Sequence, residues 1–137
     1  MVKLAKDYAP TEKEKYMNPK QIEYFKQKLI DWKAELLGES TETLGHLKEE
    51  NWNEADLADR ATVETDAALE LRTRDRYRKL ISKIDAALLR IENGEYGYCE
   101  VTGDPIGIKR LEARPIATMT VSAQEEHERK EKMHSTG

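Results

Sequence analysis

The chain has 137 residues, and its 27 acidic and 23 basic side chains leave a formal net charge of only −4. Overall charge therefore gives no general attraction to nucleic acid, and any charge-driven function depends on local segregation. The single cysteine, Cys99, rules out an intramolecular disulfide. Residues 1–17 contain no apolar segment typical of a signal peptide, and no apolar run approaches the roughly 18 residues of a membrane span. We expect a cytoplasmic protein that does not enter a membrane.

The first predicted element is a long amphipathic helix that follows a polar leader over residues 1–17. Asn18 can cap its first amides, and Pro19 suits the first helical position because proline has no N–H to leave unpaired. Apolar residues then recur three or four positions apart, as in a helix packed on a partner. These residues are Ile22, Phe25, Leu29, Trp32 and Leu36. The periodicity stops at residues 49–54, where we expect a turn.

A second helix is predicted from about Leu57 to Ile91. Its later half repeats the same spacing, with Tyr77, Ile81, Ile84, Leu88 and Ile91. Asn93-Gly94 is a typical stop signal, because glycine accepts the left-handed conformation that often ends a helix. Two long helices joined by a short turn predict an antiparallel coiled-coil hairpin over residues 18–93, with its tip near residues 50–60.

Residues 94–137 are expected to form a small globular module at the base of this hairpin, near which the leader also packs. Short β-prone runs flank a turn at residues 102–105, which predicts a β-hairpin. Ser122, followed three residues later by Glu125, predicts a capping box and a polar helix to about Lys132. The fold class is therefore mainly α, with a helical hairpin and a β-hairpin-plus-helix module.

The sequence contains no arrangement of residues typical of an enzyme. The three histidines, His46, His127 and His134, belong to no catalytic or metal-binding motif. Cys99 has no basic residue nearby that could activate it as a nucleophile, so we interpret it as a half-buried thiol. We expect a protein without catalytic activity.

Charge is sorted along the predicted hairpin. Residues 47–70 carry eight acidic and two basic side chains, and residues 72–83 carry six basic and one acidic. The acidic block includes Asp56 and Asp59, which lie on one face near the start of the second helix. They are either helix-start residues favoured by the helix dipole or exposed carboxylates that reach a cation or the hydrogen-bond donors of a protein. The two blocks are equally compatible with an ordinary solvated surface.

Four runs of the sequence together resemble the DksA family of bacterial RNA polymerase-binding proteins. They are Asp56-Leu57-Ala58-Asp59-Arg60-Ala61, Leu69-Glu70-Leu71-Arg72-Thr73-Arg74-Asp75-Arg76, Gly97-Tyr98-Cys99-Glu100 and Ile106-Gly107-Ile108-Lys109-Arg110-Leu111-Glu112-Ala113-Arg114-Pro115. The resemblance implies a hairpin that enters the polymerase secondary channel and retunes initiation with guanosine tetraphosphate in the stringent response, including inhibition of ribosomal RNA promoters. It further implies a monomer without sequence-specific DNA binding.

The resemblance assigns roles to seven residues. The polymerase-binding tip would be Asp56, Asp59 and Ala61, and Arg76 would contact the polymerase rim. Leu80, Lys83 and Arg114 would help to bind guanosine tetraphosphate, because cationic groups pair well with phosphate oxygens. A further basic residue of that pocket corresponds to Gln124 here, a departure that weakens the expected coupling to the nucleotide.

The family's four zinc-binding cysteines correspond to Cys99, Thr102, Thr120 and Ala123 in this chain. Threonine and alanine do not replace thiolates in a tetrahedral zinc site, so we expect no bound zinc. Apolar packing would hold the module instead. The residues expected to provide it are Val101, Ile106, Ile108, Leu111, Ile116, Met119 and Val121.

Two other functions remain open from the sequence. Carboxylates at the tip would suit a transcript-cleavage factor that positions Mg²⁺ in the polymerase active site. A generic helical-hairpin adaptor or chaperone would require exposed apolar residues at the tip, for which Trp52 and Leu57 are the candidates.

Overall fold

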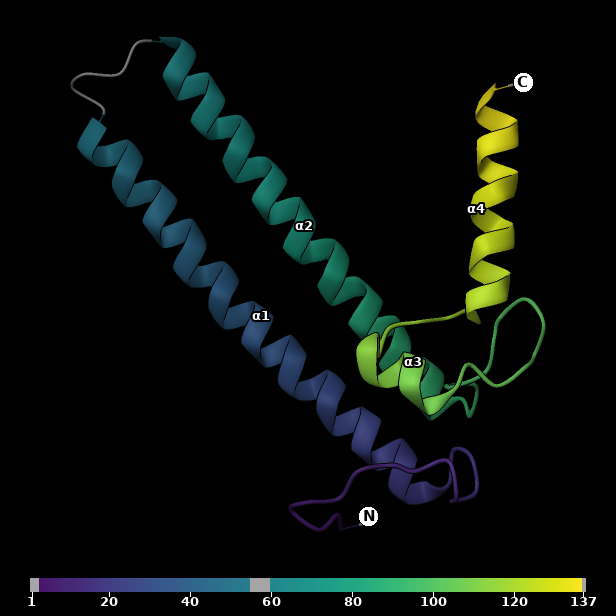
Figure 1. Cartoon of the computed structure of the whole chain (residues 1–137). Coiled ribbons are helices and arrows are strands. Elements are labelled where there is room, and N and C mark those ends of the chain that lie inside the picture. Colours follow the sequence, from purple (N-terminus) through teal and green to yellow (C-terminus); the bar gives the residue numbers. More distant parts are fainter. Residues whose placement is uncertain (1–2, 55–59, 137) are drawn as a thin grey trace. The chain divides into compact units, whose positions relative to one another are not determined.

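The protein is mainly helical, as the sequence predicts. The computed structural model describes the backbone of residues 3–54 and 60–136, and side chains over residues 3–45 and 65–134. Its helices are α1 (Pro19–Glu54), α2 (Arg60–Glu92), α3 (Ile108–Ala113) and α4 (Val121–Thr136) (Figure 1). Within these ranges, no helix is both long and apolar enough to cross a membrane.

Local capping explains where α1 begins. The Asn18 side-chain oxygen accepts a hydrogen bond from the Gln21 N–H at 2.9 Å, which confirms the predicted start at Pro19. The turn expected at residues 49–54 is wrong, because α1 continues through Glu54. This segment contains no glycine or proline, and its glutamates favour a helix. The end of the apolar periodicity at this point therefore did not mark the end of the helix.

The predicted end of α2 at Asn93-Gly94 is confirmed. Gly94 has a φ of 75°, the left-handed conformation that glycine adopts without strain. The Gly94 N–H donates to the Ile91 carbonyl at 3.2 Å, and the Glu95 N–H donates to the Arg90 carbonyl at 2.9 Å. These bonds satisfy carbonyls in the last turn of the helix.

The chain divides into two compact units, which we call the hairpin unit (Ile30–Asp85) and the terminal unit (Met1–Leu29 with Ala86–Gly137). In the hairpin unit, α1 and α2 run antiparallel and side by side (Figure 1). Lys33 and Asp85 join them by an ion pair of 2.7 Å, and Leu36, Tyr77 and Ile84 are buried. The predicted antiparallel helical hairpin is therefore confirmed.

The terminal unit has its own apolar core. Its buried side chains are Phe25, Leu29, Ala87, Tyr96, Cys99, Ile106, Ile108, Leu111, Ile116 and Ala117. Four of the seven residues expected to hold the module are among them. Val101 and Val121 are 68% and 51% exposed, so their expected role in the core is wrong, and Met119 is half-buried. Residues from the first turns of α1 complete this core. The sequence of residues 94–137 alone gives no indication of their contribution.

The β-hairpin expected near residues 98–106 is reduced to one antiparallel bridge between Tyr98 and Pro105, and the described residues form no longer strand. Pro105 has no N–H to extend a ladder, and Gly97 and Gly107 on either side have φ angles of 90° and 103°. The Cys99 N–H still closes the turn by donating to the Asp104 carbonyl at 2.8 Å. This segment is therefore a compact loop rather than a hairpin.

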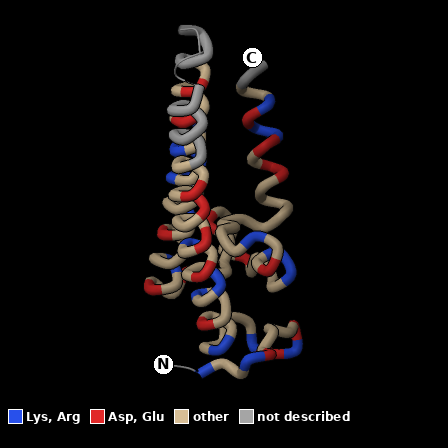
Figure 2. Tube along the Cα trace, turned by 90° about the vertical axis from the view of Figure 1, so that its left-hand side faces the viewer, with Lys and Arg blue, Asp and Glu red and all other residues tan. Residues whose placement is uncertain are grey.

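The start of α4 differs from the predicted capping box. Thr120 is the cap, and its hydroxyl accepts a hydrogen bond from the Ala123 N–H at 3.2 Å, whereas Ser122 lies inside the helix. The helix continues to Thr136, beyond the expected end near Lys132. Acidic and basic residues alternate along α4 (Figure 2). Pairs one turn apart, such as His127 with Glu131 at 3.0 Å, stabilise this exposed helix.

Candidate functional site

Half of the basic side chains of α2 between residues 72 and 83 are neutralised within the helix. Arg74 pairs with Glu70 at 2.8 Å, while Arg78 and Lys79 share Asp75 at 2.8 and 3.0 Å. Hydrogen bonds from Lys79 and Arg78 hold the pKa of the Asp75 carboxyl below its usual value. These three bases are therefore occupied by neighbours on their own helix.

The other three bases form what we call the basic stripe: Arg72, Arg76 and Lys83. All three are exposed, and none makes an ion pair with any residue that the structure describes. At 3.6 residues per turn, they lie within about 40° of one another around the helix. Their positive charge is therefore concentrated on one side of α2 and available to a partner.

The structure brings together three of the residues that the family resemblance singled out. Arg76, Leu80 and Lys83 follow one another at intervals of four and three residues, so they share a face of α2. Leu80 is half-buried between two exposed cations, and the Arg76 guanidinium carbon lies 5.8 Å from the Tyr77 ring centre. A cationic face with an apolar centre can bind an anion and pack against a flat group.

Arg114 belongs to the terminal unit, whereas Leu80 and Lys83 belong to the hairpin unit. It is exposed and forms the C-cap of α3, where its N–H donates to the Arg110 carbonyl at 2.7 Å. Gln124 lies in the first turn of α4, and its amide donates to Glu128 at 3.1 Å. The predicted nucleotide pocket therefore draws on residues that the structure describes in separate units.

A groove runs along each side of the hairpin unit, and Tyr77 contributes to both. The larger, of about 450 Å³, passes Leu71 and the ion-paired Arg74 and Arg78. The smaller, of about 290 Å³, is lined by Thr43, Leu69, Arg72, Thr73, Arg76 and Tyr77. The two grooves thus differ in charge, because the arginines of the smaller one have no carboxylate partner among the described residues.

The expected tip lies largely outside the described residues. Asp56 and Asp59 fall in the segment 55–59, which the structure does not describe, and Ala61 is placed only as part of the first turn of α2. Their role in binding stays a prediction from the family resemblance.

Two of the other positions that correspond to zinc ligands, Thr102 and Thr120, contact the Cys99 thiol. Burial raises the pKa of this thiol, but the Thr102 hydroxyl and the backbone N–H groups of Thr120, Thr102 and Val101 donate hydrogen bonds to the sulfur. Together they lower the pKa of Cys99 to about 6. Thr120 also caps α4, and Ala123 is the residue whose N–H it receives. The amide donors of a metal-binding knuckle are thus present around one thiol.

This set of donors does not fit a four-coordinate zinc site. Such a site needs four thiolate or imidazole ligands, and Cys99 supplies one. Neither a threonine hydroxyl nor the Ala123 methyl group replaces a thiolate, and no cluster of three histidine, cysteine or acidic residues suited to a metal occurs in the described ranges. The contacts that the structure shows around this thiol are the hydrogen bonds to its sulfur and the buried apolar side chains of the terminal unit.

Sequence reasoning missed a hydrogen-bond bridge from the amino-terminal segment. The Tyr16 hydroxyl donates to the Gly97 carbonyl at 2.6 Å and accepts from the Gly107 N–H at 3.0 Å. The Met17 side chain lies so close to Gly97 that an added Cβ would come within 2.6 Å of its sulfur. The tyrosines in this otherwise polar leader were the sequence signal that the segment packs against another part of the chain.

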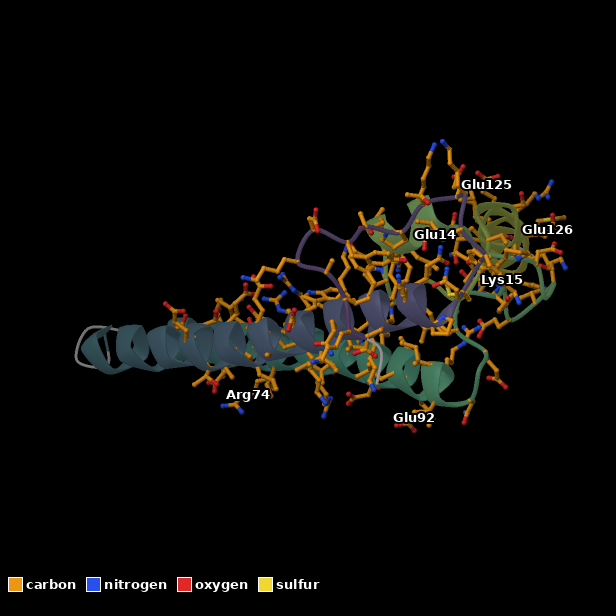
Figure 3. All side chains as sticks on the ribbon, turned by 90° about the horizontal axis from the view of Figure 1, so that it is seen from below. Glu14, Lys15, Arg74, Glu92, Glu125 and Glu126 are labelled. Atoms are coloured by element: carbon orange, nitrogen blue, oxygen red, sulfur yellow. The ribbon has the colours of Figure 1, made fainter. Side chains whose placement is uncertain are left out.

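A second network ties α1 to α3 within the terminal unit. The Lys28 ammonium lies 2.7 Å from the Glu112 carboxylate and 3.0 Å from the Glu112 carbonyl oxygen. A hydrogen bond to the same carboxylate, together with burial, raises the pKa of Tyr24 to about 12. Gln21 is fully buried, accepts from the Met17 N–H at 2.7 Å and donates to the Thr11 carbonyl. Figure 3 shows how densely side chains crowd this unit.

Two protein-family descriptions match adjacent parts of the chain. Residues 21–91 match the DnaK suppressor protein DksA, N-terminal domain, and residues 94–129 match the prokaryotic dksA/traR C4-type zinc finger. The second match covers the loop around Cys99, in which three of the four cysteines of a C4-type finger are replaced.

Individual relatives agree with this result. An RNA polymerase-binding transcription factor DksA from Caulobacter vibrioides (strain NA1000 / CB15N) is 68% identical over 128 residues, or 93% of this chain and 90% of that protein. The factor of the same name from Escherichia coli (strain K12) is 44% identical over 119 residues, or 87% and 79%. The solved structure of transcription factor DksA2 from Pseudomonas aeruginosa is similar with a TM-score of 0.70 at 34% identity, covering 85% of this chain and 90% of that one.

Proposed function

The chain belongs to the DksA family, and from this premise we propose that it binds bacterial RNA polymerase and regulates the initiation of transcription. The observation that carries the proposal is the 68% identity, over 93% of the chain, to a protein named as an RNA polymerase-binding transcription factor. The face formed by Arg76, Leu80 and Lys83 supports it, since Arg76 and Lys83 are exposed and the family resemblance assigns polymerase or nucleotide contacts to these three residues.

We propose that the hairpin, its tip and the terminal segments have different roles in binding and regulation. The hairpin, residues 18–93, enters the secondary channel, and the tip at Asp56, Asp59 and Ala61 reaches toward the active site. Leu80, Lys83 and Arg114 contact guanosine tetraphosphate at the polymerase surface and thereby couple initiation to the stringent response. Residues 1–17 and 94–137 support the hairpin as a leader and a compact module.

We further propose that this regulator works without zinc. The amide and hydroxyl hydrogen bonds to the Cys99 sulfur, together with buried Ile106, Ile108 and Leu111, support this view because they hold the loop without a metal. The protein acts in the cytoplasm as a monomer, has no catalytic activity and does not recognise a DNA sequence directly. Its effect on promoters passes through the polymerase.

The decisive experiment is run-off transcription from a ribosomal RNA promoter, with and without guanosine tetraphosphate. We expect the protein to lower the yield of transcript, and to lower it further with the nucleotide. An unchanged yield, with no binding to polymerase in a pull-down, would contradict the proposal. A stalled elongation complex provides a parallel test, since shortening of its RNA on addition of the protein would indicate a cleavage factor instead.

A further inference from the structure

In the terminal unit, a lysine on α1 neutralises an acidic residue that is close to Arg114 in the sequence. The Lys28 ammonium lies 2.7 Å from the Glu112 carboxylate and 3.0 Å from the Glu112 carbonyl oxygen, and Arg114 follows two residues later. Burial raises the pKa of the Glu112 carboxyl, but hydrogen bonds from Lys28 and Tyr24 hold this pKa below its usual value. Glu112 is therefore ionised at neutral pH, and Lys28 balances its charge.

The hairpin unit repeats this arrangement. The Lys33 ammonium lies 2.7 Å from the Asp85 carboxylate, and Lys83 precedes Asp85 by two residues on α2. Lys83 and Arg114 are both exposed, and neither makes an ion pair with the residues that the structure describes. Each of these two cations thus has an acid nearby in the sequence, and in each case that acid is already paired with a lysine of α1.

Neither ion pair adds much to the stability of the fold. In the pair of Lys28 with Glu112 both side chains are 34% exposed, and in the pair of Lys33 with Asp85 they are 35% and 51% exposed. Solvent weakens ion pairs that are exposed to this extent, and the pairs also cost side-chain entropy. Stability alone therefore gives little reason for the repeated arrangement.

An unpaired acid at either position would weaken the binding of a polyanion nearby. Residues two apart in a chain have Cα atoms at most about 7.6 Å apart, which is within the Debye length of about 8 Å at physiological ionic strength. Side chains at this spacing on a helix do not face each other, so Glu112 and Asp85 do not capture the neighbouring cations themselves. Their charges would still repel the phosphates that those cations attract.

We propose that Lys28 and Lys33 are positioning residues for guanosine tetraphosphate. Each neutralises the acid beside a cation that contacts the phosphates, so that this acid does not repel the negatively charged nucleotide. The inference rests on the proposed function, which assigns Lys83 and Arg114 to this nucleotide. The uncharged Gln124, which replaces a further basic residue of the family's pocket, increases the importance of the remaining charges.

A direct contact between these lysines and the nucleotide is the alternative, and the structure favours it less. An ammonium group has three N–H donors. The Lys28 ammonium donates to two oxygens of Glu112 and also lies 5.9 Å from the centre of the Tyr24 ring. If the lysines act through the acids, removing the charge of the acids makes the lysines dispensable, whereas a direct contact would still be lost.

The test measures the midpoint of a guanosine tetraphosphate titration in run-off transcription from a ribosomal RNA promoter. Lys28→Met and Lys33→Met should each raise the midpoint about threefold, because one unpaired carboxylate then repels the phosphates. The double variant should raise it about tenfold, since independent effects add in free energy. Inhibition without the nucleotide should not change in any of these variants, because the lysines act on the nucleotide and not on the polymerase.

Neutralising the acids provides the decisive comparison. Adding Glu112→Gln and Asp85→Asn to the double variant should bring the midpoint back to within about twofold of the unaltered protein. Lys20→Met is the matched control, because it removes the same charge from an exposed position on α1 that has no ion-pair partner among the described residues. Its midpoint should change by less than about twofold. Thermal melts within about 3 °C of the unaltered protein exclude a folding defect.

Two results would overturn the inference while leaving the proposed function in place. One is a midpoint that does not move in the variant with both lysines replaced. The other is a midpoint that stays raised after both acids are neutralised, which would mean that the lysines bind the nucleotide themselves. An unaltered protein that inhibits transcription but does not respond to the nucleotide would contradict the proposed coupling to guanosine tetraphosphate, and the inference with it.

Discussion

Replacing Tyr16 with phenylalanine tests the bridge that closes the loop between Gly97 and Gly107. The change keeps the ring, and with it the edge-on contact with Tyr98 at 5.6 Å, but removes the hydroxyl that both glycines use. Burial raises the pKa of this hydroxyl, so it stays protonated and can act as donor and acceptor at once throughout the neutral range.

The expected loss of stability depends on which hydrogen bonds Gly97 and Gly107 keep when the Tyr16 hydroxyl is removed. The Gly97 carbonyl still accepts from the Ile106 N–H at 2.8 Å, so it keeps a partner. The Gly107 N–H has no other hydrogen bond within the described residues and is left without an acceptor. Leaving a partly buried donor unpaired costs about 1–3 kcal/mol of unfolding free energy. For a chain of this length, in which 1 kcal/mol shifts the melting temperature by about 3.5 °C, we expect the melting temperature of Tyr16→Phe to fall by about 3–10 °C.

The assay is thermal and urea unfolding followed by circular dichroism, with Tyr98→Phe as the matched control. Tyr98 is more exposed, and its hydroxyl makes no hydrogen bond with the described residues, so its removal should change the melting temperature by less than about 2 °C. Identical melting curves for Tyr16→Phe and the unaltered protein would show that the bridge contributes nothing to stability.

Because the folded pKa of Cys99 is about 6, against an ordinary value of 9.0, its thiolate stabilises the fold increasingly as pH rises from 6 to 9. The difference in melting temperature between the unaltered protein and Cys99→Ala should therefore grow over this range, and a constant difference would contradict it. Excess chelator should leave the melting temperature unchanged, and metal analysis should find less than stoichiometric zinc. Lys83→Ala should raise the midpoint of a guanosine tetraphosphate titration of transcription by about tenfold or more while leaving nucleotide-independent inhibition intact; an unmoved midpoint would exclude Lys83 as a ligand. Asp59→Asn should abolish regulation at a ribosomal RNA promoter with little change in polymerase affinity, and an equal loss of affinity would make Asp59 a binding anchor.

The helix ends that could be predicted are those fixed by nearby residues. Asn18 and Gly94 act on amides and carbonyls within a few positions, so their effect is visible in the sequence. The cap of α4 was predicted at Ser122, but Thr120 is the cap, and its backbone N–H also donates to the Cys99 sulfur, a contact that the local sequence does not indicate. The continuation of α1 to Glu54 was missed because amphipathic periodicity reports burial and not helix as such.

Contacts between distant segments could not be predicted from spacing. Val101 and Val121 are apolar and lie among core residues in the sequence, yet both face solvent. The volume beside the loop is filled instead by Phe25, whose ring lies 5.9 Å from that of Tyr96. The basic stripe was visible only as a block of positive charge, because which bases are neutralised depends on side-chain geometry. The separation of Arg72 and Arg76 from the paired Arg74 required the structure.

The terminal unit is assembled from both ends of the polypeptide, and this has a consequence for biosynthesis. The Tyr16 bridge joins residues 81 and 91 positions apart, and the Lys28–Glu112 pair joins residues 84 apart. A growing chain can coil α1 as soon as it emerges, but Phe25 has no core to enter until Tyr96 and Leu111 have been translated. At about 5–20 residues per second, this interval lasts several seconds, during which the apolar face of α1 is open to chaperones or to other nascent chains.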